Sequence, residues 1–317
     1  MTRFSSITAI TFSTAILLLV AGCSATTVQP PVAKTAAPEA GFGHVHALGV
    51  DRQTGETFAA THNGVWTVPT GDLPETYLTG APRSTQEDVI KVGDGSQDTM
   101  GFVVAHPGLL LASGHPAPGE QPDLARPNLG LISSTDSAKT WASISLHGET
   151  DFHDIDAVML PNNALRVFGY DSGTGEIKVS DDGGATWATG ASIPLRNLVA
   201  DPTEPDRVFA TTEQGLMVSN DGARSFVVEP NAPMLYLIDA VDPDEGGGFI
   251  GIGIEGDVWH QNGATGEWFV PGKVESVPEA FSYAGGDEPW ILVSNERGIS
   301  ASPDYGQTWV VLAPSKE

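Results

Sequence analysis

Five of the eight histidines in this 317-residue chain are candidate metal ligands. His44 and His46 alternate within a predicted strand, so both rings face the same side. Neutral imidazoles bind zinc or copper, and Met100 adds a soft thioether donor. The alternative is that the rings are hydrogen-bonded supports or a pH-sensitive patch. The candidate ligands are His44, His46, His62, His115 and His153.

Three glutamates are expected where predicted second strands end, namely Glu213, Glu255 and Glu296. With Tyr236 and Arg196 they are weak candidates for glycoside hydrolysis, which needs paired acidic or nucleophilic groups and, for an acidic sugar, a cationic clamp. The competing interpretation is that they are the solvated ends of strands. The sequence by itself leaves both interpretations open.

A repeated octapeptide indicates which elements position these side chains. Residues 180–187 and 302–309 match Ser-x-Asp-x-Gly-x-Thr-Trp in full, and residues 134–141 and 219–226 match with substitutions. A degenerate copy of the octapeptide is expected at residues 262–268. The Ser and Asp side chains can bond backbone N–H groups across a tight turn, Gly supplies a positive φ, and Trp packs between sheets. We therefore expect structural roles for Asp136, Asp182, Asp221 and Asp304.

Short strand pairs precede these turns and give the number of repeat units. Six such pairs are rich in small and β-branched residues and are bounded by Gly, Pro, Asp and Asn. Each unit has about 45 residues, the usual size of a four-stranded blade. The prediction is an all-β, six-bladed β-propeller. A seventh blade within residues 68–92 stays open, as does ring closure by pairing the strand after Gly41 with the one ending at Leu312.

The topology of a propeller predicts which residues share one face. Strands within a blade alternate in direction, so the innermost strands begin where the second strands end. The repeated turns, between the third and fourth strands, lie at the opposite end. The innermost strands are expected to begin near these positions: His44 and His46, Met100, His153, Arg196, Tyr236 and Phe281. The five histidines should therefore converge at one mouth of the central channel, all from the first three blades.

The N-terminus has the pattern of a secretion signal. Arg3 precedes an apolar stretch that reaches Val20, which is typical of a signal peptide. Residues 19–23 resemble a bacterial lipobox, with the lone Cys23 as the acylated residue. We expect a signal peptide at 1–22, a lipidated Cys23 with an Ala/Thr/Pro tether at 23–41, and the propeller at 42–317. The protein would then be anchored to the outer face of the bacterial cell membrane.

Composition excludes several classes of function. The chain has 40 acidic and 15 basic residues and a formal charge of −25, so we expect no nucleic-acid partner. One Cys excludes a disulfide framework and a Cys-ligated zinc finger. The 37 Gly and 23 Pro residues are typical of a turn-rich all-β protein.

The octapeptide resembles the Asp box, or bacterial neuraminidase repeat, of sialidases, sortilin-type receptors and photosystem assembly factors. The whole chain is similar to actinobacterial lipoproteins described as glycosyl-hydrolase-like. The resemblance implies a propeller fold and no particular chemistry. The favoured function is a binding platform for a protein or glycan ligand, with the histidine-rich site at its mouth. The alternative is a sialidase-like exo-glycosidase, although the Phe/Tyr-Arg-Ile-Pro motif of sialidases is absent.

Overall fold

The structure is a computed structural model that describes residues 41–117 and 127–315. Ala40–Glu317 form one compact unit, which contains every strand described below. The predicted signal peptide, Cys23 and nearly all of the predicted tether lie outside the described residues. Within the described part of the chain, no helix has the length and apolar character needed to cross a membrane.

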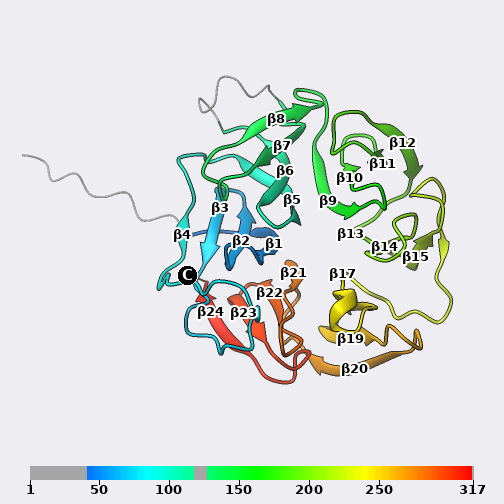
Figure 1. Ribbon diagram of the computed structural model, residues 1–317. Coiled ribbons are helices and arrows are strands. Elements are labelled where there is room, and N and C mark those ends of the chain that lie inside the picture. Colours follow the sequence, from blue (N-terminus) through cyan, green and yellow to red (C-terminus); the bar gives the residue numbers. More distant parts are fainter. Residues whose placement is uncertain (1–40, 118–126, 316–317) are drawn as a thin grey trace, which may run out of the picture. The chain divides into compact units, whose positions relative to one another are not determined.

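Six four-stranded antiparallel sheets are arranged in a ring, as Figure 1 shows, and their first strands line a central channel. This arrangement confirms the predicted all-β, six-bladed propeller. The described residues add one short 3-10 helix, η1 (Pro243–Glu245), between the first two strands of blade 5. Strands that are consecutive in sequence are neighbours in each sheet, so every blade is a simple meander.

The first three blades carry the predicted histidines. Blade 1 consists of β1 (Val45–Asp51), β2 (Glu56–Thr61), β3 (Gly64–Val68) and β4 (Ile90–Lys91). Blade 2 consists of β5 (Asp98–His106), β6 (Leu109–His115), β7 (Leu131–Ser134) and β8 (Ala142–Ser145). Blade 3 consists of β9 (Phe152–Met159), β10 (Leu165–Asp171), β11 (Glu176–Ser180) and β12 (Ala188–Ser192).

The last three blades carry the predicted glutamates. Blade 4 consists of β13 (Asn197–Ala200), β14 (Val208–Thr212), β15 (Gly215–Ser219) and β16 (Val227–Val228). Blade 5 consists of β17 (Leu237–Ala240), β18 (Phe249–Ile252), β19 (Asp257–Gln261) and β20 (Trp268–Lys273). Blade 6 consists of β21 (Ala280–Tyr283), β22 (Ile291–Asn295), β23 (Gly298–Ser302) and β24 (Val310–Pro314).

The hydrophobic core is divided among the blade interfaces. Second strands such as β2 are buried on both faces, because a neighbouring blade covers each side. Phe58 of blade 1 packs on Phe102 of blade 2, and Phe209 of blade 4 packs on Phe249 of blade 5. A fully buried phenylalanine contributes about 1.5–3 kcal/mol. Six such clusters, one per interface, hold the ring together.

Four of the turns between third and fourth strands share one hydrogen-bond pattern. In blade 3, Asp182 Oδ1 accepts from Ser180 Oγ at 2.7 Å and from Thr186 N at 2.8 Å, and Gly184 N donates to Ser180 Oγ. These hydrogen bonds, with that from the Thr186 backbone foremost, lower the pKa of Asp182 to about 2. The same pattern surrounds Asp136, Asp221 and Asp304. In blade 5, Asn262 Oδ1 accepts two backbone N–H groups in the equivalent turn.

Residues 69–89, here called the closing segment, join β3 to β4 and contact blade 6. Apart from β4, residues 68–92 add one isolated bridge, between Tyr77 and Gly286, and no seventh blade. The strand closure considered for the termini is also not found among the described strands. Instead, Leu78 N donates to Gly285 O, and the Trp290 ring packs edge-on against Tyr77 at 5.6 Å. The closing segment therefore reinforces the joint between blades 1 and 6, whose strands also share one hydrophobic cluster.

Removing the side chain of Trp290 should destabilise the joint between blades 1 and 6. Trp290 is 1% exposed and its indole N–H donates to Thr76 Oγ1. We expect Trp290→Ala to lower the free energy of unfolding by about 3–5 kcal/mol, measured by urea denaturation. The control is Ile90→Ala on exposed β4, which should change it by less than about 0.5 kcal/mol. Equal stabilities of the two variants would show that the closing segment contributes little.

Candidate functional site

The channel opens at the end opposite the repeated turns. The channel cavity, of about 240 Å³, is lined by the inner strands of all six blades. A basin of about 840 Å³ lies at its mouth and is lined by His44, His46, Met100, Arg196 and a group of glutamates from blades 5 and 6. An apolar groove of about 590 Å³ adjoins the basin, between blades 4 and 5.

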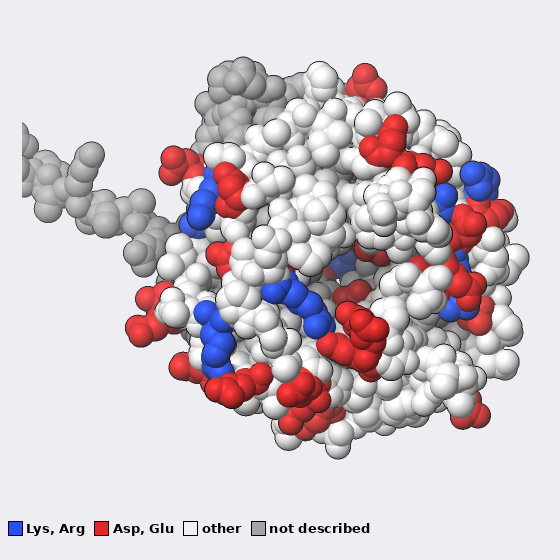
Figure 2. All heavy atoms as spheres, in the orientation of Figure 1, with Lys and Arg blue, Asp and Glu red and all other residues white. Residues whose placement is uncertain are grey.

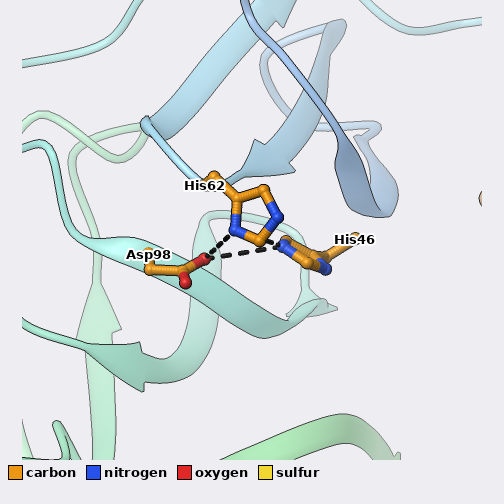
Figure 3. A group of neighbouring side chains, drawn as sticks. All are labelled: His46, His62 and Asp98. Carbon is orange, nitrogen blue, oxygen red and sulfur yellow. Dashed lines mark hydrogen bonds and ion pairs between the residues drawn. The ribbon is translucent and has the colours of Figure 1, made fainter.

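His46, His62 and Asp98 form the first histidine cluster, drawn in Figure 3. His46 lies on β1, His62 follows β2, and Asp98 begins β5 of the next blade. His46 Nε2 lies 3.1 Å from His62 Nδ1, and Asp98 Oδ1 lies 2.9 Å from His62 Nδ1 and 3.5 Å from His46 Nε2. Three donor atoms of the types that zinc and copper prefer thus face one another.

His44 lies beside this cluster but has a partner of its own. Its ring centroid is 4.9 Å from that of His46 and 5.6 Å from that of His62. His44 Nδ1 pairs with Glu279 Oε1 at 3.0 Å, and Glu279 Oε2 also accepts the backbone N–H of Val45. His44 therefore connects the histidine cluster of blade 1 to the acidic side of the mouth.

His115, Asp151 and His153 form the second histidine cluster, between blades 2 and 3. Asp151 Oδ2 lies 2.7 Å from His153 Nε2 and 3.3 Å from His115 Nε2, and it also accepts from Ser172 Oγ. The other carboxylate oxygen, Oδ1, is buried and has no hydrogen-bond partner among the described residues. Four of the five predicted histidines thus belong to two clusters, and His44 lies beside the first of them.

The pKa shifts keep the donors of the first cluster available to a cation. Burial lowers the pKa of His46 despite its hydrogen bond with Asp98, and the nearby His62 and His44 rings lower it further. Although burial opposes ionisation of Asp98, the hydrogen bonds from His46 and His62 lower its pKa. At neutral pH the cluster therefore presents a neutral imidazole on His46 and an ionised carboxylate on Asp98.

The candidate catalytic residues lie on the opposite side of the mouth. The Arg196 guanidinium lies over the Tyr236 ring, 5.1 Å from its centroid, and donates to the Glu279 carbonyl oxygen. Glu255 lines the basin with Tyr236, although no hydrogen bond joins these two side chains in the described part of the chain. The remaining two glutamates are apart, Glu296 in the basin beside Ser276 and Glu213 in the apolar groove.

Sequence reasoning missed the carboxylates that organise the histidines. Asp98, Asp151 and Glu279 were not predicted as site residues. Asp98 follows His62 by 36 positions, and Asp151 follows His115 by the same interval. This repeated interval between a histidine and an aspartate could have identified both carboxylates from the sequence. In blade 6 the innermost strand begins at Ala280. Glu279, rather than the predicted Phe281, therefore stands at the edge of the mouth.

Three carboxylates lie deeper, within the channel. Asp154, Asp156 and Asp239 each accept a backbone N–H from the inner strand of the next blade or of their own strand. Burial raises the pKa of Asp154 and Asp239 to about 6. Burial and the neighbouring charges of Asp239 and Asp154 raise that of Asp156 to about 8. The channel is therefore less negative near neutral pH than its composition implies.

Comparisons with known proteins indicate a fold and no family. No family model matches the sequence, and no curated protein matches it. Solved β-propellers do resemble the structure. A gluconolactonase from Xanthomonas campestris has 9% identity and a TM-score of 0.57, covering 82% of this chain and 86% of its own. The WD40 propeller domain of Doa1 has 13% identity and a TM-score of 0.50, covering 86% and 84%.

Glycoside hydrolases of the GH74 class are also among the similar structures. The GH74 xyloglucanase from Xanthomonas campestris has 16% identity and a TM-score of 0.52, covering 85% of this chain and 45% of its own. The present chain thus spans less than half the length of the GH74 enzymes it matches. At these identities the likeness establishes the β-propeller class alone.

The stability of the propeller should decrease as the pH rises, because of Asp156. Its folded pKa of about 8 lies above an unfolded value of about 3.9. The stabilisation is therefore complete below about pH 4 and is lost as the pH rises through about 8. We expect Asp156→Asn to flatten this decrease in urea-denaturation experiments at pH 5, 6, 7 and 8.5.

A matched substitution separates this effect from the general titration of the acidic surface. Asp72→Asn removes one carboxylate from an exposed position in the closing segment. It should leave the slope of stability against pH unchanged. The interpretation of Asp156 fails if the two variants have the same slope as the unmodified protein.

Proposed function

We propose that this protein is a lipid-anchored β-propeller on the outer face of the bacterial cell membrane, and that it binds zinc or copper at the histidine side of its channel mouth. The observation that supports this function best is the convergence of His46, His62 and Asp98. Their donor atoms lie within 4.8 Å of one another. Three protein ligands with an open fourth position are the usual arrangement of an accessible zinc site.

The surroundings of the first cluster favour a cation with little rearrangement. The side chain of His46 is 11% exposed and that of His62 is 50% exposed, so one ligand is fixed and the other can adjust. The ring of His46 stays neutral because burial lowers its pKa. A metal ion would bind His46 Nε2, His62 Nδ1 and Asp98 Oδ1 in place of the close contacts that now join these atoms.

The charge of the whole protein supports the same function. Acidic residues outnumber basic ones over the face shown in Figure 2, and the formal charge is −25. A field of this sign raises the local concentration of cations and speeds their capture. The second cluster, His115, Asp151 and His153, offers further donors at the adjacent interface.

The sialidase-like alternative has less support. An exo-glycosidase of that kind needs several arginines around the sugar carboxylate. Among the described residues that line the channel and basin, Arg196 is the one arginine, and Arg297 is paired with Glu275. The turns around Asp136, Asp182, Asp221 and Asp304 are consistent with the Asp-box propellers that the sequence resembles, which include binding proteins as well as enzymes.

The metal site should depend on His62 and Asp98. We expect the purified full-length protein to bind Zn²⁺ in isothermal titration calorimetry. His62→Ala and Asp98→Asn should each weaken binding by about 10- to 100-fold, because each removes a ligand or the partner that orients one. The matched control is His106→Ala, at the opposite end of β5 from the mouth, which should change affinity by less than about twofold. Absence of Zn²⁺ and copper binding by the unmodified protein would refute the function.

Membrane attachment should depend on Cys23. We expect the protein to fractionate with membranes after expression in its bacterial host and to carry acyl chains on Cys23, detectable by mass spectrometry of the N-terminal peptide. Cys23→Ala should release it to the soluble extracytoplasmic fraction, because two or more acyl chains are needed for stable anchoring. A Cys23→Ala protein that still sediments with membranes would show that another element attaches it.

A further inference from the structure

The inner strands of blades 1, 2 and 3 share an irregularity at the mouth. In each strand the pairing register shifts by one residue, which leaves a single residue unpaired. A β-bulge of this kind redirects the side chain of the extra residue. The three unpaired residues are His46, Met100 and His153. Two imidazoles and a thioether thus occupy equivalent positions in adjacent blades.

β5 and β9 are in close contact at this level, and β1 is in close contact with β5 three residues further along the channel. A Cβ atom on Gly101, next to Met100, would lie 2.7 Å from the carbonyl oxygen of Phe152, next to His153. A Cβ atom on Gly49 of β1 would lie 2.9 Å from the Phe102 ring of β5. His46, Met100 and His153 also line the same channel cavity. Met100 therefore stands between the two histidines on the channel wall.

The hydrogen bonds of the two histidines leave one nitrogen of each ring available. His46 Nε2 faces Asp98, and His153 Nε2 faces Asp151. Neither Nδ1 has a hydrogen-bond partner among the described residues, and Figure 3 shows the second ring nitrogen of His46 turned away from Asp98. Metal-binding histidines usually have this arrangement, in which a carboxylate accepts one ring N–H and orients the other nitrogen as the ligand.

We propose that His46 Nδ1, Met100 Sδ and His153 Nδ1 form a three-coordinate copper(I) site on the channel wall. The proposal rests on the proposed function and assigns it a second, inner site with its own metal. Thioether sulfur is a soft donor that selects copper(I), whereas zinc and copper(II) favour imidazole and carboxylate donors. Asp98 and Asp151 act in this site as positioning residues. The cluster of His46, His62 and Asp98 uses the opposite nitrogen, His46 Nε2, for a divalent ion. A neutral imidazole has one lone-pair nitrogen, so the two ions are alternatives at His46 and do not bind together.

The two sites are distinguished by two variants of the full-length protein, Met100→Leu and His62→Ala, each measured with both metals. Cu(I) affinity is measured without oxygen, by competition with a chromogenic Cu(I) chelator, and Zn²⁺ affinity by calorimetry. Met100→Leu preserves volume and removes the sulfur, so it should weaken Cu(I) binding at least about tenfold and change Zn²⁺ binding by less than about twofold. His62→Ala should instead weaken Zn²⁺ binding at least about tenfold and change Cu(I) binding by less than about twofold. The control is Met234→Leu, in the apolar groove.

A spectroscopic measurement tests the ligands directly. X-ray absorption at the copper edge should show a sulfur neighbour in the Cu(I)-loaded protein, and Met100→Leu should remove it. Copper(I) binding that is unchanged in Met100→Leu, or a copper spectrum without sulfur, would overturn the inner site while the proposed divalent site stands. Zn²⁺ binding that is insensitive to His62→Ala would instead overturn the proposed site. Failure of the unmodified protein to bind either metal would refute both.

Discussion

The inner edge of each blade imposes the constraint on which the rest of the structure depends. The first strand of every sheet is an edge strand, and its free N–H groups face a narrow channel. In blades 3 to 6, side chains of one inner strand accept these groups from the next. Asp154 accepts from Leu198, Asn197 accepts from Ile238, and Asp239 accepts from Tyr283.

Blades 1 to 3 solve the same problem differently. The positions equivalent to Asp154 and Asp156 are Gly101 and Val103 in blade 2, where no side-chain acceptor is present. These inner strands approach so closely that Gly49 and Gly101 have no room for a side chain. Close packing therefore replaces hydrogen bonds from one inner strand to the side chains of the inner strand before it, and Phe152 N donates instead to Ser113 Oγ on the second strand of blade 2. The bulges that redirect His46, Met100 and His153 all occur here.

Much of the fold could be predicted because each repeated turn is stabilised by hydrogen bonds between residues close together in the sequence. Asp182 and Ser180 form their turn within a few residues, so the sequence pattern and the hydrogen bonds coincide. The closing segment could not be predicted, because Tyr77 and Trp290 meet only once the ring is complete. Residues 69–89 have no repeat to compare with, and their length permitted a seventh blade.

The site was predictable in position and not in detail. Alternating strand direction places His46, His62, His115 and His153 at one mouth, whatever their partners. Their division into two clusters depends on Asp98 and Asp151, which belong to the blade following His62 and His115 respectively. Such contacts depend on how adjacent blades stack. A prediction made from the strands of each blade separately does not include this stacking.

The availability of donor atoms, rather than charge, explains where a metal ion would bind. The channel carboxylates attract cations to the axis, but Asp156 and Asp239 already accept backbone N–H groups, and burial raises the pKa of both. Binding a cation there would break the contacts that join neighbouring blades. At the mouth, Asp98 and Asp151 are instead held by imidazoles, which exchange a proton for a metal without loss of backbone pairing. The half of the ring in which carboxylates at the mouth pair with imidazoles, rather than with inner-strand N–H groups, is therefore the half that can bind a metal ion.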